Sequence, residues 1–219
     1  MLDGLSVKIA WFDTEFSDKF GSGTLLAFNN PEQLFGIPGT VFRDAQGNIE
    51  RLNLFTVNLA ERYSEYLDVS LRYQFDTARW GYYTVGANAT LNAQLQDVAT
   101  PGAEPTDLHG TPGGPERWKG YGYLNWAQGN ATLNLTANYS SSYEGLTFSP
   151  QERVENYLTF DLTGSYEFGD SGWKVYAGAR NITNKEFPFF DSSTPWDPRR
   201  VDLRGRVVHL EVRKSYDLF

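Results

Sequence analysis

The sequence is built from segments in which apolar and polar residues alternate with a period of two. Between Ala131 and Ser140, Ala, Leu and Tyr occupy every second position, and Thr, Asn and Ser fill the positions between them. This period predicts a β-strand with one apolar face and one polar face. The same pattern recurs in residues 67–75, 83–94, 158–168 and 208–218. The chain is therefore expected to be all-β, with one side of its sheet apolar.

The strand candidates and their connections follow a regular plan. About eight segments qualify as strands: residues 4–12, 60–75, 80–96, 118–126, 131–143, 157–168, 173–181 and 206–219. Short connections at 76–79, 127–130 and 169–172 alternate with long ones at 13–58, 97–117, 144–156 and 182–205. Bacterial outer-membrane barrels combine short periplasmic turns with long extracellular loops. We therefore predict an antiparallel transmembrane β-barrel segment of about eight strands.

Aromatic residues gather near the ends of the predicted strands. Amphipathic rings are enriched where a barrel wall meets the lipid headgroups, so two belts are expected. The predicted belt residues are Trp11, Tyr73, Trp126, Tyr139, Tyr166, Phe168, Trp173 and Tyr216. The alternative is that these rings form the core of a β-sandwich, because aromatic residues favour strands in general.

Composition excludes several classes of function. The net charge of −8 argues against a nucleic-acid partner, which requires a basic surface. Cysteine is absent, and His109 and His209 show no metal-ligand spacing, so we expect no metal, no cofactor and no enzymatic activity. No signal peptide precedes the first predicted strand. An exported protein needs such a signal, so we expect the chain to be part of a longer one.

The C-terminal region carries the most specific phrases. A predicted strand from Trp173 ends in Asn181-Ile-Thr-Asn-Lys185, and Asp197-Pro-Arg-Arg200 and then Gly205-Arg206 lead into the last strand. These phrases resemble the end of TonB-dependent outer-membrane receptors, and nearly the whole chain is similar to the barrel of that family. The resemblance implies the last part of a barrel of about 22 strands in the outer membrane of a Gram-negative bacterium.

The resemblance also implies partners. The N-terminal strands and the plug domain of the family are missing, so TonB would be reached only through a plug outside this chain. Phe219 would be the terminal aromatic presented to the barrel-assembly machinery, although it lies one residue out of phase with Tyr216. Outer-membrane lipid would surround the wall.

The family takes up scarce solutes, so the resemblance implies a ferric siderophore first, with a glycan or cobalamin as alternatives. Aromatic rings can stack on such ligands and arginines can pair with an anionic chelate. The candidate contacts, all in the loop before the last strand, are Phe189, Phe190, Trp196, Arg199 and Arg200. The alternative is that these side chains only pack the rim and anchor the loop.

Two other functions remain open at this stage. Eight antiparallel strands could close into a self-contained small barrel with a structural or adhesive role, its interior filled by side chains. A soluble β-sandwich could instead bind carbohydrate through aromatic loops. The receptor-barrel interpretation differs from both, because it requires the unpaired edge strands to meet further strands.

Overall fold

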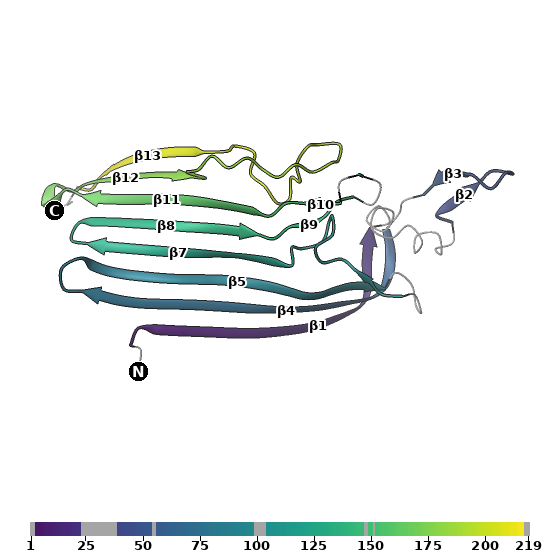
Figure 1. The fold of residues 1–219 in the computed structure, drawn as a ribbon, viewed down its shortest axis with the longest axis horizontal. Helices are drawn as coiled ribbons and strands as arrows, with labels where there is room; N and C mark the ends of the chain where they lie inside the picture. Colours follow the sequence, from purple (N-terminus) through teal and green to yellow (C-terminus); the bar gives the residue numbers. More distant parts are fainter. Residues whose placement is uncertain are drawn as a thin grey trace.

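The computed structural model describes residues 3–22, 39–53, 56–98, 104–146, 149–150 and 152–216, and within them the chain forms one main antiparallel sheet. The long strands are β1 (Leu5–Ser22), β4 (Thr56–Thr77), β5 (Gly81–Val98), β7 (Trp118–Gln128), β8 (Ala131–Ser140), β11 (Tyr157–Glu167), β12 (Trp173–Arg180) and β13 (Val207–Lys214). Each pairs with the next long strand along the chain, and they lie side by side in one layer (Figure 1). The predicted all-β antiparallel architecture of about eight strands is confirmed.

The connections sort by length onto the two ends of the sheet. Tight turns join β4 to β5 and β7 to β8, and the short 3₁₀ helix η1 (Gly169–Ser171) lies between β11 and β12. The long connections lie at the opposite end, and β1 begins and β13 ends at the turn end (Figure 1). The predicted segregation of short turns from long loops is therefore present.

Three short strand pairings lie at the loop end of the sheet, as far as the chain is described. They are β2 (Val41–Arg43) with β3 (Ile49–Leu52), β9 (Tyr143–Glu144) with β10 (Arg153–Val154), and β6 (Thr106–Asp107) on the side of β5. The connection predicted at 13–58 is wrong in part, because β1 runs to Ser22 and pairs with the extended start of β4 at Thr56. The strands continue beyond the alternating part of the sequence.

A bulge marks the transition to this extension. The register of β4 on β5 shifts between Glu65, which faces Gln94, and Tyr66, which faces Asn92. Ala93 is therefore the additional residue on β5. On the turn side of the bulge the outer face carries Leu67, whereas on the loop side the same face carries acidic residues.

The two faces of the sheet differ in chemistry. The outer face bears apolar side chains that no other part of the described chain covers: Ile9 is 66% exposed, Val208 72% and Leu210 71%. The inner face bears polar side chains that bond across strands. Thr90 donates to Asp68 over 2.6 Å, and Asn138 donates to Asp161 over 3.0 Å.

The edges of this sheet decide between the sequence-based alternatives. Among the described residues, β1 and β13 pair with one neighbour each and not with one another, so the eight strands form an open wall and not a closed small barrel. No second sheet packs on the apolar face in the described ranges, which contradicts the β-sandwich. Unpaired edges of this length are open to pairing with further strands.

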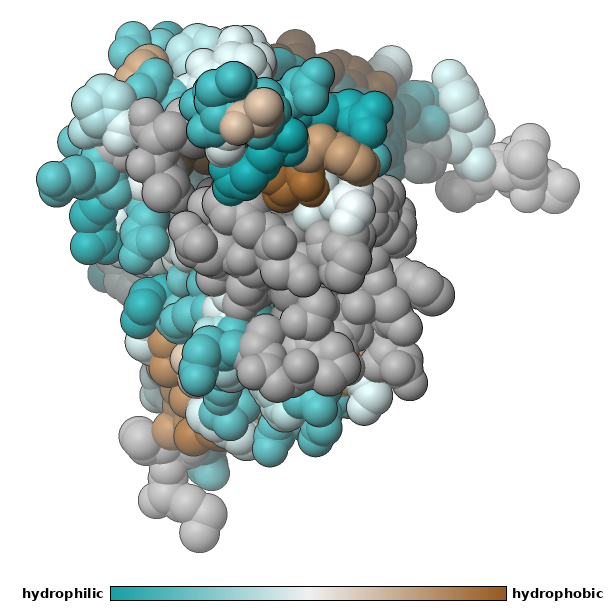
Figure 2. Space-filling model, turned by 90° about the vertical axis from the view of Figure 1, so that its right-hand side faces the viewer, coloured by the Kyte–Doolittle hydropathy of each residue, from teal (hydrophilic) through white to brown (hydrophobic). Residues whose placement is uncertain are grey.

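Tight packing occurs among the loops instead of between sheet faces. The buried residues Leu108, Glu116, Tyr143, Phe190 and Asp197 all come from connections at the loop end. Viewed from that end, most of the coloured surface is hydrophilic, and brown hydrophobic atoms also show along its lower left flank (Figure 2). The loop end is thus a folded structure with a small core of its own.

Candidate functional site

The turn after β12 explains why this part of the sequence is distinctive. Asn181 and Asn184 adopt positive φ angles of 48° and 50°, a left-handed conformation for which asparagine is enriched. The Asn181 side-chain oxygen accepts from the Lys185 main-chain amide over 2.9 Å, and the main-chain amide of Asn181 donates to the Asp161 carboxylate over 2.8 Å. Asn184 accepts from the Arg206 amide over 3.1 Å. These bonds tie the end of β12 to the start of the last strand.

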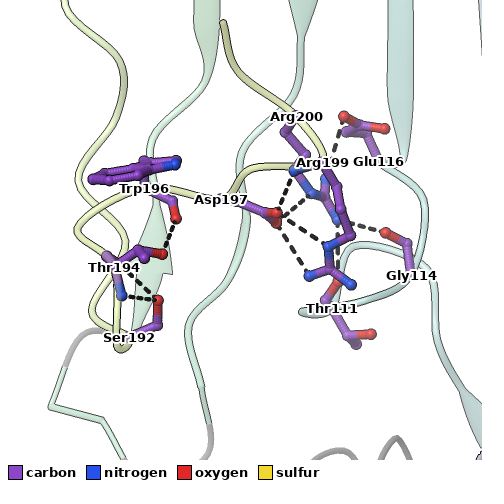
Figure 3. Close-up of polar contacts among 9 residues, drawn as sticks. All are labelled: Thr111, Gly114, Glu116, Ser192, Thr194, Trp196, Asp197, Arg199 and Arg200. Carbon is purple, nitrogen blue, oxygen red and sulfur yellow. Dashed lines mark hydrogen bonds and ion pairs between the residues drawn. The ribbon is translucent and has the colours of Figure 1, made fainter. Parts of the chain in front are cut away.

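The long loop between these strands carries a buried ion-pair network (Figure 3). The Arg200 side chain is 7% exposed and that of Asp197 is 1% exposed. Nε of Arg200 donates to Oδ2 of Asp197 over 3.2 Å, and Nη1 lies 3.4 Å from Oε1 of Glu116. Arg199 bonds the same Asp197 carboxylate from its Nε over 3.1 Å, but its side chain remains 53% exposed.

Arg200 also reaches a second connection. Its Nη2 donates to the carbonyl of Thr111 over 3.2 Å and to that of Gly114 over 2.5 Å, both in the loop between β5 and β7. Its guanidinium carbon lies 3.8 Å from the centroid of the Tyr143 ring in β9. One side chain therefore contacts three connections that are separate in sequence.

Charge in this network is balanced. Burial alone would raise the pKa of the Asp197 carboxyl, but hydrogen bonds from Arg199 and the charges of both arginines outweigh it and lower the pKa. Burial, with the nearby charge of Asp197, raises the pKa of the Tyr143 hydroxyl. The aspartate is therefore charged and the tyrosine neutral at neutral pH.

An apolar cluster lies beside the ion pairs. Tyr143, Val154 and Phe190 are buried together, and the partly buried Leu146 packs against them. The rings of Tyr143 and Phe190 are 6.0 Å apart at 51°. We call these residues together with Thr111, Gly114, Glu116, Asp197 and Arg200 the loop cluster.

Below the loop cluster, the inner face of the sheet encloses a hollow of about 760 Å³. Its walls carry charges of both signs, including Lys8, Lys119, Arg180, Asp68 and Asp161. A hollow of this volume lies within the range of about 300–1,000 Å³ typical of small-molecule sites. Apolar residues such as Phe12 and Val69 line it as well, so the hollow offers both charged and apolar surface.

Aromatic residues of the outer face fall into rows set by the strand register. Near the turns, Phe75, Tyr83 and Trp126 are direct neighbours across β4, β5 and β7. Near the loops, Trp11 and Trp118 occupy one row, with Leu67 and Leu91 between them. Eight residues separate the two rows along β7, which is about 27 Å of strand. At a tilt of about 40° this gives a height of ~20 Å, near the ~25 Å apolar band of outer-membrane barrels.

The other predicted belt residues also lie on the outer face near strand ends. Tyr73 stacks on Phe75 at 5.3 Å, and Tyr166 meets Phe168 edge-on at 4.9 Å. The remaining members are exposed: Tyr139, Trp173 and Tyr216. Their position is observed, whereas their role as a membrane belt stays a prediction. Phe219 lies outside the described residues.

Comparison with known proteins gives a match in structure alone. No protein-family model matches the sequence, and no curated protein matches it. A mutant ferric enterobactin receptor of Pseudomonas aeruginosa superposes with a TM-score of 0.63 at 15% identity, over 98% of this chain and 29% of that one. The FrpB iron transporter of Neisseria meningitidis gives 0.54 at 13% identity, over 96% of this chain and 29% of that one.

The fold is that of part of the β-barrel in these solved structures. Another mutant of the Pseudomonas receptor, in complex with enterobactin, superposes with a TM-score of 0.60 at 15% identity, over 96% of this chain. The segment spans about 29% of the length of each of these chains. The resemblance proposed from the C-terminal phrases thus holds at the level of fold.

In this barrel segment the five predicted ligand contacts divide into two groups. Phe190 and Arg200 are buried in the loop cluster. Phe189 is 59% exposed, Arg199 is half-exposed, and the half-buried Trp196 packs edge-on against Phe187 at 6.0 Å. The surface left for a ligand on this loop is therefore that of Phe189, Trp196 and Arg199, and their role stays a prediction.

The described residues hold neither a metal-ligand cluster nor a membrane-spanning helix. Across the ranges that the structure describes, no group of three or more His, Cys, Asp or Glu side chains is arranged to hold a metal ion. Within the same ranges, no helix has the length and hydrophobicity needed to cross a membrane.

Proposed function

We propose that the chain is part of the wall and extracellular loops of a TonB-dependent outer-membrane receptor that imports a scarce solute. The observation that carries the proposal is a single-layer sheet whose exposed face is apolar and whose opposite face is polar and hollow. In water an uncovered apolar face of this extent promotes association. In a bilayer lipid covers it, and the backbone stays bonded within the sheet.

The remaining parts of the receptor lie outside this segment in the proposal. The unpaired edges of β1 and β13 would meet further strands, which would complete a barrel of about 22 strands. A plug in the lumen would contact the polar inner face and connect ligand binding to TonB. The role of this segment is then transport and not catalysis.

For the solute, a ferric siderophore is the first candidate. The support is the likeness to a ferric enterobactin receptor and to an iron transporter, together with an exposed aromatic ring and a half-exposed arginine on one loop. An arginine can pair with an anionic chelate, and a ring can stack on a catechol.

The test expresses the whole receptor that contains this segment in an iron-limited Gram-negative host, with and without TonB. We expect it in the outer-membrane fraction, with heat-modifiable migration on a gel, and we expect uptake of a ferric siderophore labelled with radioactive iron only when TonB is present. A protein that remains in the soluble fraction would refute the membrane assignment. Uptake of a glycan or cobalamin and not of ferric catecholates or hydroxamates would correct the solute class.

A further inference from the structure

We propose that Arg200 is a positioning residue that locks three loops into one rigid unit, and that Arg199 is the cation this unit presents to an anionic solute. The inference rests on the proposed function for the ligand, but the lock itself is a property of this chain. It assigns opposite roles to two adjacent arginines of equal charge.

Burial and partners separate the two arginines. Arg200 is 7% exposed, and its guanidinium faces Asp197, Glu116 and two main-chain carbonyls at once. Arg199 is 53% exposed and bonds Asp197 from the solvent side. Arg200 borders the hollow of the inner face, but its guanidinium is already engaged by these partners within the loop cluster.

The bonds of Arg200 cross long stretches of sequence. Thr111 and Gly114 lie 89 and 86 residues before it, and they belong to the loop after β5. That loop bonds in turn to β9, whose Glu144 amide donates to the Gly110 carbonyl over 2.7 Å. The connection carrying Arg200 is therefore tied to β9 both directly and through a second loop.

The geometry requires arginine at this position. A planar guanidinium can donate to a carboxylate from one edge and to two carbonyls from another while its face rests on a ring. The Tyr143 ring lies 3.8 Å from the guanidinium carbon, as such stacking requires. A lysine ammonium would keep the charge and lose this arrangement.

Removing Arg200 would leave two carboxylates without their shared partner. Asp197 is almost wholly buried and keeps the bonds from Arg199 and a hydrogen bond with Tyr143, and Glu116 keeps the hydroxyl of Ser140 at 3.0 Å. A buried charge that loses its partner is strongly destabilising. The loss would open the loop after β5 as well as the loop carrying Arg200.

The experiment is hydrogen exchange on the full protein in detergent, without ligand, comparing Arg200→Gln, Arg200→Lys and the matched control Arg199→Gln. For both Arg200 variants we expect exchange in residues 104–116 and 186–201 to rise at least about tenfold, with strand 131–140 unchanged. Arg199→Gln should leave 104–116 at the wild-type rate. Unchanged exchange in 104–116 for Arg200→Gln, or rescue by lysine, would overturn the lock.

A second variant covers the case in which Arg200→Gln does not accumulate. Tyr143→Leu leaves Arg200 in place, keeps an apolar side chain beside Phe190, and removes the stacked ring and its hydroxyl. It should raise exchange in both loops; a rise confined to residues near 143 would contradict the lock. Binding of ferric enterobactin is measured separately. Arg199→Gln should weaken it at least about fivefold with the loops intact, and equal affinity would refute that role. If the wild type binds no ferric siderophore, the proposed solute and the role of Arg199 fail together, while exchange still decides the lock.

Discussion

Lipid contact at the centre of the wall can be tested with one substitution, Leu71→Arg. Leu71 lies on the outer face of β4, where it faces Val7 on β1 and Ala87 on β5, and it is 42% exposed. Phe75, in the aromatic row near the turns, and Leu67, in the Trp11 row, are each four residues away. Leu71 is therefore midway between the two rows, about 13 Å of strand from each.

The magnitude separates the two environments. An arginine on the lipid face at the midplane of an outer-membrane barrel costs about 2–4 kcal/mol. At 1.4 kcal/mol per factor of ten, this lowers the folded-to-unfolded ratio about 30-fold to 700-fold. At an exposed position in water the same change stays within about 0.5 kcal/mol.

The assay is the urea midpoint of the full protein refolded into lipid vesicles, with the folded fraction read from heat-modifiable migration. The matched control is Ser70→Arg, one residue away on the inner face, where the side chain enters the hollow and Asp68 lies on the same strand face. We expect Leu71→Arg to lose about 2–4 kcal/mol and Ser70→Arg less than about 1 kcal/mol. Equal effects of the two variants would refute the assignment of the outer face to lipid.

Three further outcomes are expected. Gly178→Ala places a Cβ 2.5 Å from the ring of His209 and 2.8 Å from Cγ2 of Thr163, and it should cost about 1–3 kcal/mol in chemical denaturation, with partial recovery when His209→Ala is added. Folding lowers the pKa of Asp197, so the stability that its ionised form contributes is present above the unfolded carboxyl pKa of about 4 and is lost as pH falls below it. Proteolysis of the loops should therefore accelerate between about pH 5 and 3, and a flat profile would contradict this. Trp126→Phe removes a 2.7 Å bond to the Trp80 carbonyl and should cost about 0.5–1.5 kcal/mol, measured by the urea midpoint against Trp80→Phe, which keeps that carbonyl.

The strands of the sheet could be predicted from the sequence because one face of the sheet is apolar and the other polar, and this imposes an alternation with a period of two. The part of β1 nearest the loops was not predicted, because the alternation of apolar and polar residues ends near Trp11. Beyond Trp11 the outer face carries Asp13 and Glu15 and the other face Phe16, so the hydrophobic pattern is lost while pairing with β4 continues. Main-chain bonds do not depend on side-chain polarity, and no pattern records them.

The candidate site was predicted in place and not in detail. Arg199 and Arg200 are adjacent and equally charged, so the sequence offered no basis for distinguishing them. The difference arises from the carbonyls of Thr111 and Gly114, which any residue could supply. By contrast, the paired asparagines at 181 and 184 did carry a signal, because their side chains form the turn itself.

The bulge at Ala93 has a consequence for how such a chain can change. If the outer face meets lipid as proposed, lipid fixes the strand phase on the turn side of the bulge, since slipping by one residue would turn every Leu and Val toward the lumen. The bulge already accommodates one unmatched residue, so the ribbon on its far side can gain or lose length without altering that phase. Insertions and deletions at the loop end can therefore accumulate while the strand pairing on the turn side of the bulge stays unchanged.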